Sequence, residues 1–337
     1  MRISPRVLVV AIGVLLAVGV VGQLLPTSRG TYRLAAGRPM RDVLVYAKPA
    51  GPCCKPTEKP EQIWVAATDG SHPKLLTEGK DPTVSPDGRY VAYASEGKVL
   101  VVPTAGGAAT TIARGAYPGW APNSRFLAYY GAAGLVVVDV ETGKQVTTIS
   151  RDGKEWPDGF AFSPDSQRIA YTIHYDLYVV HTQGGPPIQL TDDHKSVAPV
   201  WGEAGIAFNR FTHKAHADIW LSDGTAHHLR QLTHTGADTW PAFFSASGNE
   251  LLAANPANHN GRLWAVDVAI GVEHPITPWI GDLVPQGLSA DGSTVLAATG
   301  CGGTVSRYGY VETIPFAGGK PHVIVRGPCR ASWNAGR

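Results

Sequence analysis

Histidine, arginine and aromatic residues gather in four short stretches between residues 192 and 262. Imidazole, guanidinium and indole groups can each bind a ligand through hydrogen bonds, charge or ring contacts. The sequence therefore predicts a ligand or partner surface in this part of the chain. Its candidate residues are Asp193, His194, Arg210, His213, His216, His234, Trp240 and His259.

Two of these histidines form a His213-x-x-His216 pair that could bind zinc or another divalent cation together with Asp218, His194 or His234. The spacing matches no recognised metal motif. We favour a solvated loop whose histidines bind no metal, and we predict no cofactor.

Several aspartates could be mistaken for acidic site residues. Asp81, Asp238 and Asp282 each come shortly before a proline, and Asp176 and Asp218 each come directly before an apolar segment. We interpret all five as structural carboxylates that accept backbone N–H groups.

Motifs of common catalytic sites are missing from the sequence. It contains no Gly-x-Ser-x-Gly nucleophile turn, no phosphate-binding loop, no His-Glu-x-x-His and no dinucleotide-binding fingerprint. The sequence therefore predicts that the chain is not an enzyme.

A repeated segment sets the positions of these residues. Ser-Pro-Asp-Gly at 85–88 is followed by an apolar strand, and related copies begin at residues 121, 163, 202, 245 and 289, at intervals of 36 to 44 residues. This period is typical of units with four short strands. Proline presets the turn that asparagine, aspartate and glycine complete.

Each unit has an aromatic or β-branched third strand, and seven such strands begin near residues 63, 99, 135, 177, 219, 263 and 310. The first unit lacks a first strand, and residues 330–334 resemble one. We therefore predict an all-β, seven-bladed propeller in which a C-terminal strand closes blade 1, because closure removes exposed strand edges.

The repeats resemble those of the TolB β-propeller family, which has WD40-like repeats. Ser163 to Tyr171 and Asp176 to Thr191 carry the resemblance, which covers about residues 42–334. The resemblance implies a periplasmic setting. TolB has six blades behind a separate N-terminal domain, which residues 23–42 are too few to form, so its docking role does not transfer residue by residue.

The four cysteines all fall near the predicted closing seam. Cys53 and Cys54 lie in a blade 1 loop, Cys301 lies in the equivalent blade 7 loop, and Cys329 lies in the connection between these blades. An even number in an exported chain indicates disulfides. Our first choice is Cys54–Cys329 with Cys53–Cys301. The alternatives are Cys53–Cys54 with Cys301–Cys329, or a zinc site.

The first 25 residues direct the chain to a membrane. Arg2 and Arg6 precede an uncharged apolar run from Val7 to Leu25. This pattern is that of a signal peptide or an uncleaved signal anchor. We predict a linker at 26–41 and the propeller at 42–337, located outside the cytoplasm in the periplasm, at the membrane or secreted.

Charge and composition leave binding as the favoured role. The chain has 29 basic and 27 acidic residues and a formal net charge of +2, which is not typical of a nucleic-acid-binding protein. We expect a monomeric scaffold that binds an envelope protein or peptide and has no catalytic role. The alternative is a carbohydrate- or metal-binding propeller, either a lectin or a hydrolase or lyase, that uses the loop face of blades 4–6.

Overall fold

A computed structural model describes residues 32, 34–49, 60–150, 157–211, 216–225, 228–234, 239–255, 261–278, 283–299, 309–328 and 330–334. The N-terminal hydrophobic segment, all four cysteines, His213 and His259 lie outside these residues. The predictions made for them therefore stay predictions. No membrane-spanning helix occurs within the described ranges.

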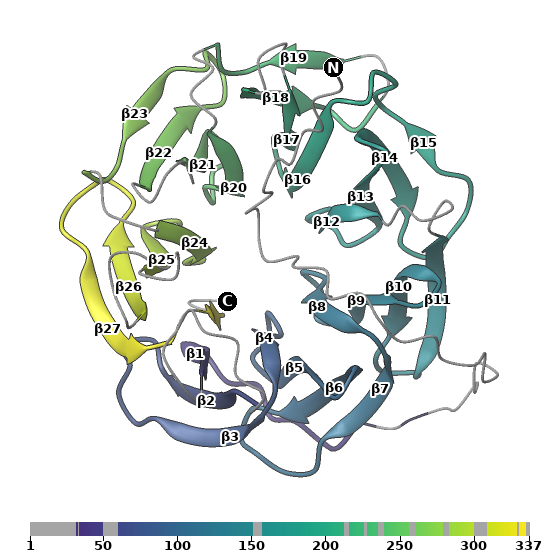
Figure 1. Cartoon of the computed structure of the whole chain (residues 1–337), viewed down its shortest axis with the longest axis vertical. Helices are drawn as coiled ribbons and strands as arrows, with labels where there is room; N and C mark the ends of the chain where they lie inside the picture. Colours follow the sequence, from purple (N-terminus) through teal and green to yellow (C-terminus); the bar gives the residue numbers. More distant parts are fainter. Residues whose placement is uncertain are drawn as a thin grey trace, which may run out of the picture.

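Seven four-stranded antiparallel sheets, or blades, stand around a common centre (Figure 1). This arrangement confirms the predicted all-β, seven-bladed propeller. Blades 2, 3 and 4 come first along the chain, and each is one continuous chain segment. Their strands are β4 (Lys80–Val84), β5 (Tyr90–Ser95), β6 (Lys98–Pro103), β7 (Thr110–Arg114), β8 (Ala116–Trp120), β9 (Phe126–Gly131), β10 (Gly134–Asp139), β11 (Lys144–Ser150), β12 (Asp158–Phe162), β13 (Arg168–Ile173), β14 (Asp176–His181) and β15 (Ile188–Gln189).

Blades 5, 6 and 7 repeat the same order from the centre outward. Their strands are β16 (Ser196–Gly202), β17 (Gly205–Phe211), β18 (Ala217–Ser222), β19 (Leu229–Gln231), β20 (Trp240–Phe244), β21 (Glu250–Asn255), β22 (Arg262–Asp267), β23 (Glu273–Pro275), β24 (Leu283–Leu288), β25 (Thr294–Thr299), β26 (Gly309–Pro315) and β27 (His322–Gly327).

Blade 1 combines the two ends of the described chain. Its strand order is β28-β1-β2-β3. These strands are β28 (Arg330–Trp333), β1 (Val43–Lys48), β2 (Gln62–Ala67) and β3 (Lys74–Glu78).

Hydrogen bonds within the Ser-Pro-Asp-Gly turn explain why this sequence recurs. The Ser85 hydroxyl donates to Asp87 Oδ1 at 2.6 Å and accepts the Tyr90 N–H at 3.0 Å. Asp87 Oδ1 also accepts the Arg89 N–H at 3.0 Å. The Asp87 N–H in turn donates to Ser124 Oγ of the next blade, also at 3.0 Å. The repeat motif therefore builds this first-to-second-strand turn and joins blade 2 to blade 3.

The Leu-Thr or Ile-Thr segment near the end of three repeats also has a structural role. The hydroxyls of Thr191, Thr233 and Thr277 accept a backbone N–H near the start of β14, β18 and β22, at 2.8, 2.9 and 3.1 Å. The donors are Leu177, Ile219 and Leu263. All three threonines are buried. Each one satisfies a buried donor that the fourth strand does not reach.

Seven apolar clusters of buried residues fill the seven interfaces between blades. The cluster between blades 7 and 1 contains Leu44, Tyr46, Leu296 and Val311, and each of these side chains is at most 1% exposed. Blades therefore stabilise one another by burying apolar side chains between neighbours.

The inner strands carry bulges close to the loop-rich face. Asp81, Tyr117 and Ala198 occupy the same place in β4, β8 and β16, with φ of 51°, 52° and 52°, and each precedes a proline. A register shift accompanies each of them. Asp81 forms an ion pair with Arg330 of β28. We predicted that the Asp81 carboxyl accepts backbone N–H groups. In the structure it contacts the Arg330 guanidinium and so links the inner strands of blades 1 and 2.

Two glycines with the same backbone conformation allow a prediction about packing between blades 1 and 2. Gly88 and Gly97 have φ of 68° and 69°. A Cβ on Gly88 would lie 1.8 Å from Met40 O and 2.4 Å from Asn334 Nδ2, whereas a Cβ on Gly97 would meet no atom within 4 Å. We expect Gly97→Ala to lower the free energy of unfolding by about 1 kcal/mol. Gly88→Ala should lower the free energy of unfolding by roughly 2 kcal/mol more than Gly97→Ala, because Met40 and Asn334 must move to make room for the methyl group.

Urea unfolding of the two variants measures the difference, because the backbone strain is common to both. Equal losses would contradict close packing of Met40 and Asn334 over the turn at Gly88.

A buried carboxyl in blade 7 gives a pH-dependent prediction. Glu312 is 8% exposed and its Oε2 has no hydrogen-bond partner among the described residues. Burial raises the pKa of the Glu312 carboxyl, and a hydrogen bond from Thr299 opposes this shift. A raised folded pKa favours the protonated form, so stability falls as the pH rises from the unfolded pKa through the folded pKa.

Glu312→Gln should therefore stabilise the protein by about 1 kcal/mol at pH 8, the order of cost of one poorly satisfied buried polar group. The gain should disappear near pH 4. Thermal unfolding at both pH values measures it, and Glu78→Gln, at an exposed position, is the control. A gain that is equal at both pH values would contradict the burial of an ionised carboxylate.

Candidate functional site

The loop-rich face is formed by the second-to-third-strand loops and the connections between blades. On this face in blade 5, Arg210 Nε and Nη2 donate to Asp193 Oδ2 at 3.0 and 2.6 Å. Lys195 Nζ lies 3.7 Å from the same oxygen. The Arg210 guanidinium also lies 4.5 Å from the centroid of the Trp220 ring. Arg210 is therefore held in place by a carboxylate and an indole, which presents a fixed charged pair at the surface.

A histidine and a buried aspartate form a second fixed group. His194 lies 2.8 Å from Asp176 Oδ2 through Nδ1, and its backbone N–H donates to Asp176 Oδ1 at 2.9 Å. The His174 carbonyl lies 3.1 Å from the same Nδ1. The Asp176 side chain is 2% exposed and the His194 side chain is 71% exposed. Asp176 accepts a backbone N–H, as predicted, and also orients an exposed imidazole.

Three aromatic rings from consecutive blades follow one another across this face. The centroids of Tyr175 and Phe211 are 6.4 Å apart, and those of Phe211 and Trp240 are 6.3 Å apart. The planes meet at 71° and 74°, which is the edge-to-face geometry that aromatic pairs favour. They come from the β13–β14 turn, β17 and β20, which belong to blades 4, 5 and 6 (Figure 1). We call these three residues the aromatic row.

The structure brings together part of the predicted residue set. Asp193 and Arg210 contact each other, and Trp240 belongs to the aromatic row. His216 and His234 are exposed at the ends of the adjoining strand β18 and strand β19. Within the described ranges, no three histidine, cysteine, aspartate or glutamate side chains are close enough to hold a metal ion. The metal alternative therefore gains no support from these residues.

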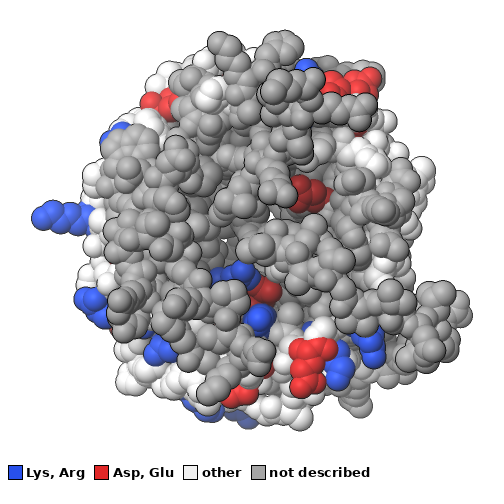
Figure 2. All heavy atoms as spheres, in the orientation of Figure 1, with Lys and Arg blue, Asp and Glu red and all other residues white. Residues whose placement is uncertain are grey.

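Charge is dispersed on the face seen in Figure 2. Lysine, arginine and acidic side chains lie around the rim and near the centre, and the described residues there form no large patch of one sign.

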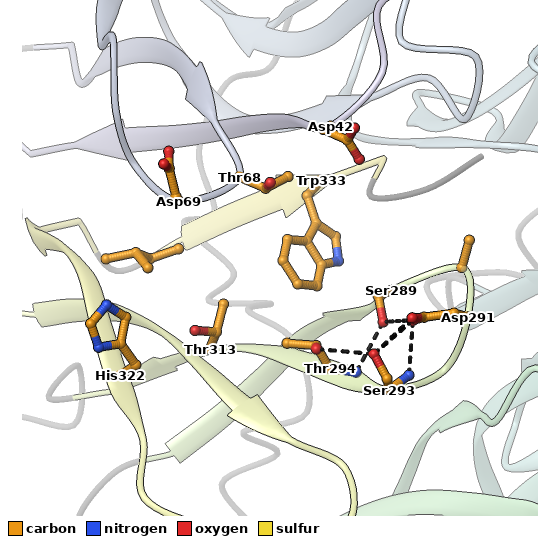
Figure 3. A pocket seen from close by; sticks show the side chains of 12 residues that line it. Asp42, Thr68, Asp69, Ser289, Asp291, Ser293, Thr294, Thr313, His322 and Trp333 are labelled. Atoms are coloured by element: carbon orange, nitrogen blue, oxygen red, sulfur yellow. Dashed lines mark hydrogen bonds between the residues drawn. The ribbon is translucent and has the colours of Figure 1, made fainter.

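A pocket of about 450 Å³ lies between blades 7 and 1 on the opposite face (Figure 3). Asp42, Asp69, Asp291, His322 and Trp333 are among its lining residues. The Ser289 and Ser293 hydroxyls donate to Asp291, and these bonds hold the pKa of Asp291 below its usual range. Asp69 likewise accepts the Ser71 N–H at 2.9 Å. Asp69 and Asp291 therefore already accept hydrogen bonds within turns. This makes the pocket a weaker candidate for a binding site than the aromatic row.

Sequence reasoning missed three residues of the loop-rich face. Tyr175 and His174 form a two-residue turn in the repeat, and Phe211 ends a strand. Two-residue turns between strands usually contain asparagine or glycine. The turn at His174 and Tyr175 contains neither, and this departure is the sequence signal that could have identified it. Asp176 was interpreted as structural only, because the histidine that it orients is 18 residues away in the next blade.

Comparison with known proteins tests the fold. A family model described as the dipeptidyl peptidase IV N-terminal region matches residues 131–205. No protein of curated function matches the chain. A putative TolB from Agrobacterium tumefaciens is 15% identical, with a TM-score of 0.53 and coverage of 87% of this chain and 91% of that one.

The chain has a TolB-like propeller fold. Enzymes share this fold. Oligogalacturonate lyase from Vibrio parahaemolyticus has a TM-score of 0.57 and 11% identity, with 86% of each chain covered. A prolyl endopeptidase has a TM-score of 0.64 and 13% identity, with coverage of 88% of this chain and 50% of that one.

These relatives overturn the prediction that this TolB-like propeller is not an enzyme. That prediction was wrong because it treated the missing motifs as excluding catalysis, whereas the same fold occurs in a lyase and an endopeptidase. At such low identity the likeness shows the fold alone and assigns no activity to this chain.

Proposed function

We propose that this TolB-like propeller binds an envelope protein or peptide through the loop-rich face of blades 4–6. The aromatic row is the observation that carries the proposal. Tyr175 is 51% exposed, so its ring is available for contact. Phe211 contacts this ring edge-to-face, and Trp240 contacts Phe211 in the same geometry. Aromatic residues are enriched at the centres of protein interfaces because they provide large contact areas with little loss of conformational entropy.

Fixed polar groups beside the row would supply specificity. The Asp193–Arg210 pair and the Asp176–His194 pair are oriented before any partner arrives. Preorganised groups lose less entropy on binding than mobile ones. Function in propellers commonly resides in loops held by a rigid scaffold, which agrees with this placement.

The same proposal includes the setting of the ring. We infer that residues 1–25 export the chain as a cleaved signal peptide or an anchor, that residues 26–41 form a linker, and that the ring acts as a monomer outside the cytoplasm. Disulfides among the four cysteines would suit that oxidising setting. N-terminal sequencing of the mature protein and non-reducing peptide mapping test these points, and four free thiols would overturn the disulfides.

Affinity capture tests the proposed function. The full-length chain, extracted and immobilised through a tag, is incubated with envelope extract of its source organism, and a glycan array is screened in parallel. We expect repeated recovery of one discrete protein. Binding to glycans with no protein recovered would overturn the proposal in favour of a carbohydrate-binding propeller.

A further inference from the structure

Three exposed residues on the loop-rich face have left-handed backbone conformations. His174 and Tyr175 form the turn between β13 and β14, with φ of 53° and 61°, and His194 has φ of 56°. All three are exposed. Left-handed conformations are unfavourable for residues that carry a Cβ. We call His174, Tyr175 and His194 the strained tip.

Another blade makes the same turn with a residue that suits it. In blade 2 the turn between β5 and β6 consists of Glu96 and Gly97, with φ of 49° and 69°. The flanking pairs are equivalent, with Ser95 opposite Lys98 in blade 2. The fold therefore accommodates glycine where blade 4 has Tyr175, and the tyrosine adds strain that the turn itself does not need.

Strain of this kind persists only where the surroundings hold it, and it is concentrated at functional sites. At His194 the Asp176 carboxylate holds it by binding both the backbone N–H and the ring of that residue. Because Nδ1 faces Asp176 and the His174 carbonyl, Nε2 on the other side of the exposed ring is the available hydrogen-bond acceptor. Tyr175 provides an exposed ring from the adjoining turn.

We propose that the strained tip is the primary contact for an extended peptide, with His194 Nε2 accepting an N–H group and the Tyr175 ring covering an apolar side chain. This inference rests on the proposed function and specifies the ligand of the same face. An extended peptide fits better than a sugar, because successive rings of the aromatic row meet at 71° and 74°. Rings at these angles do not form the flat stacking platform that a sugar ring favours.

The test exchanges the turn residues of the two blades. The full-length chain is probed with an array of unstructured 12-residue peptides and with a glycan array. Tyr175→Gly should weaken binding to the selected peptides at least tenfold, while relief of strain raises Tm by about 2 °C. The reciprocal variant Gly97→Tyr should lower Tm and leave peptide binding unchanged.

His194→Phe gives an independent readout, because it keeps a ring and removes the acceptor. We expect a tenfold loss of binding to the same peptides. Diethylpyrocarbonate, which acylates unprotonated imidazole nitrogens, should modify His194 in the free protein, and bound peptide should protect it.

The outcomes separate this inference from the proposed function. If peptides bind the native chain and both Tyr175→Gly and His194→Phe equally well, the strained tip is not the contact, although the proposed function stands. If Tyr175→Gly lowers Tm by several degrees, the tyrosine is structural and the inference is overturned. If only glycans bind, both the inference and the proposed function fail.

Discussion

Deleting residues 330–337 is expected to lower the free energy of unfolding by at least about 4 kcal/mol, a large fraction of the total stability of a typical protein. The deletion removes β28, which pairs with β1 from Leu44 opposite Trp333 to Ala47 opposite Arg330. It would expose the edge of β1 and part of the apolar cluster between blades 7 and 1.

Side chains of the last residues add to this loss. Asn334 Oδ1 accepts the Val43 N–H at 2.9 Å, and its Nδ2 donates to Met40 O at 2.7 Å. The Ser332 hydroxyl accepts the Val84 N–H of blade 2 at 3.2 Å. Each such bond contributes about 1 kcal/mol, and the donors left without partners cost more.

Urea unfolding measures the effect, and hydrogen exchange locates it. We expect faster exchange in blades 1 and 7 and little change in blade 4. Removal of residues 335–337 alone is the control because it leaves β28 intact. If the longer truncation costs less than about 1 kcal/mol, the predicted closure of the ring by the C-terminal strand does not hold.

Trp240→Ala is expected to weaken binding of the captured partner by about 30-fold or more, which corresponds to roughly 2 kcal/mol. Trp240 begins inner strand β20, and its ring contacts Phe211 edge-to-face. Truncation removes the largest apolar surface of the aromatic row and one of its two ring contacts. The expected loss is that of an interface hot spot, in which tryptophan is enriched.

Titration calorimetry with the captured partner measures this change, and circular dichroism checks that the variant is folded. Trp240→Phe, which keeps a ring, should recover part of the affinity. Ile270→Ser alters an exposed apolar residue in the turn between β22 and β23, on the opposite face, and should leave affinity unchanged. Equal affinity of the native protein and Trp240→Ala would remove Trp240 from the interface.

The architecture was predictable because its causes are local and repeated. Ser85, Asp87 and their counterparts form turns within six residues of chain, and Thr191 contacts Leu177, 14 residues earlier. Such contacts leave a periodic record in the sequence, from which the number of blades follows. Trp240, Asp193 and Arg210 could likewise be placed on one face from the strand order alone.

The arrangement of the site was not predictable in the same way. The Asp176–His194 pair and the Tyr175–Phe211 contact cross a blade interface, and no repeat spacing encodes them. The left-handed conformation of Tyr175 contradicts local preference, so a rule based on propensity would place glycine there. Catalysis could not be judged from motifs either, because enzymes of different chemistry share this fold.

Site-specific photo-crosslinking tests the central claim most directly. A photoreactive phenylalanine analogue is placed at position 175 on the loop-rich face or, in a matched variant, at position 270 on the opposite face, and both full-length proteins are irradiated in envelope extract. Binding through blades 4–6 predicts one discrete protein adduct from position 175 and none from position 270. An adduct from position 270 alone, or the same adducts from both positions, would contradict it.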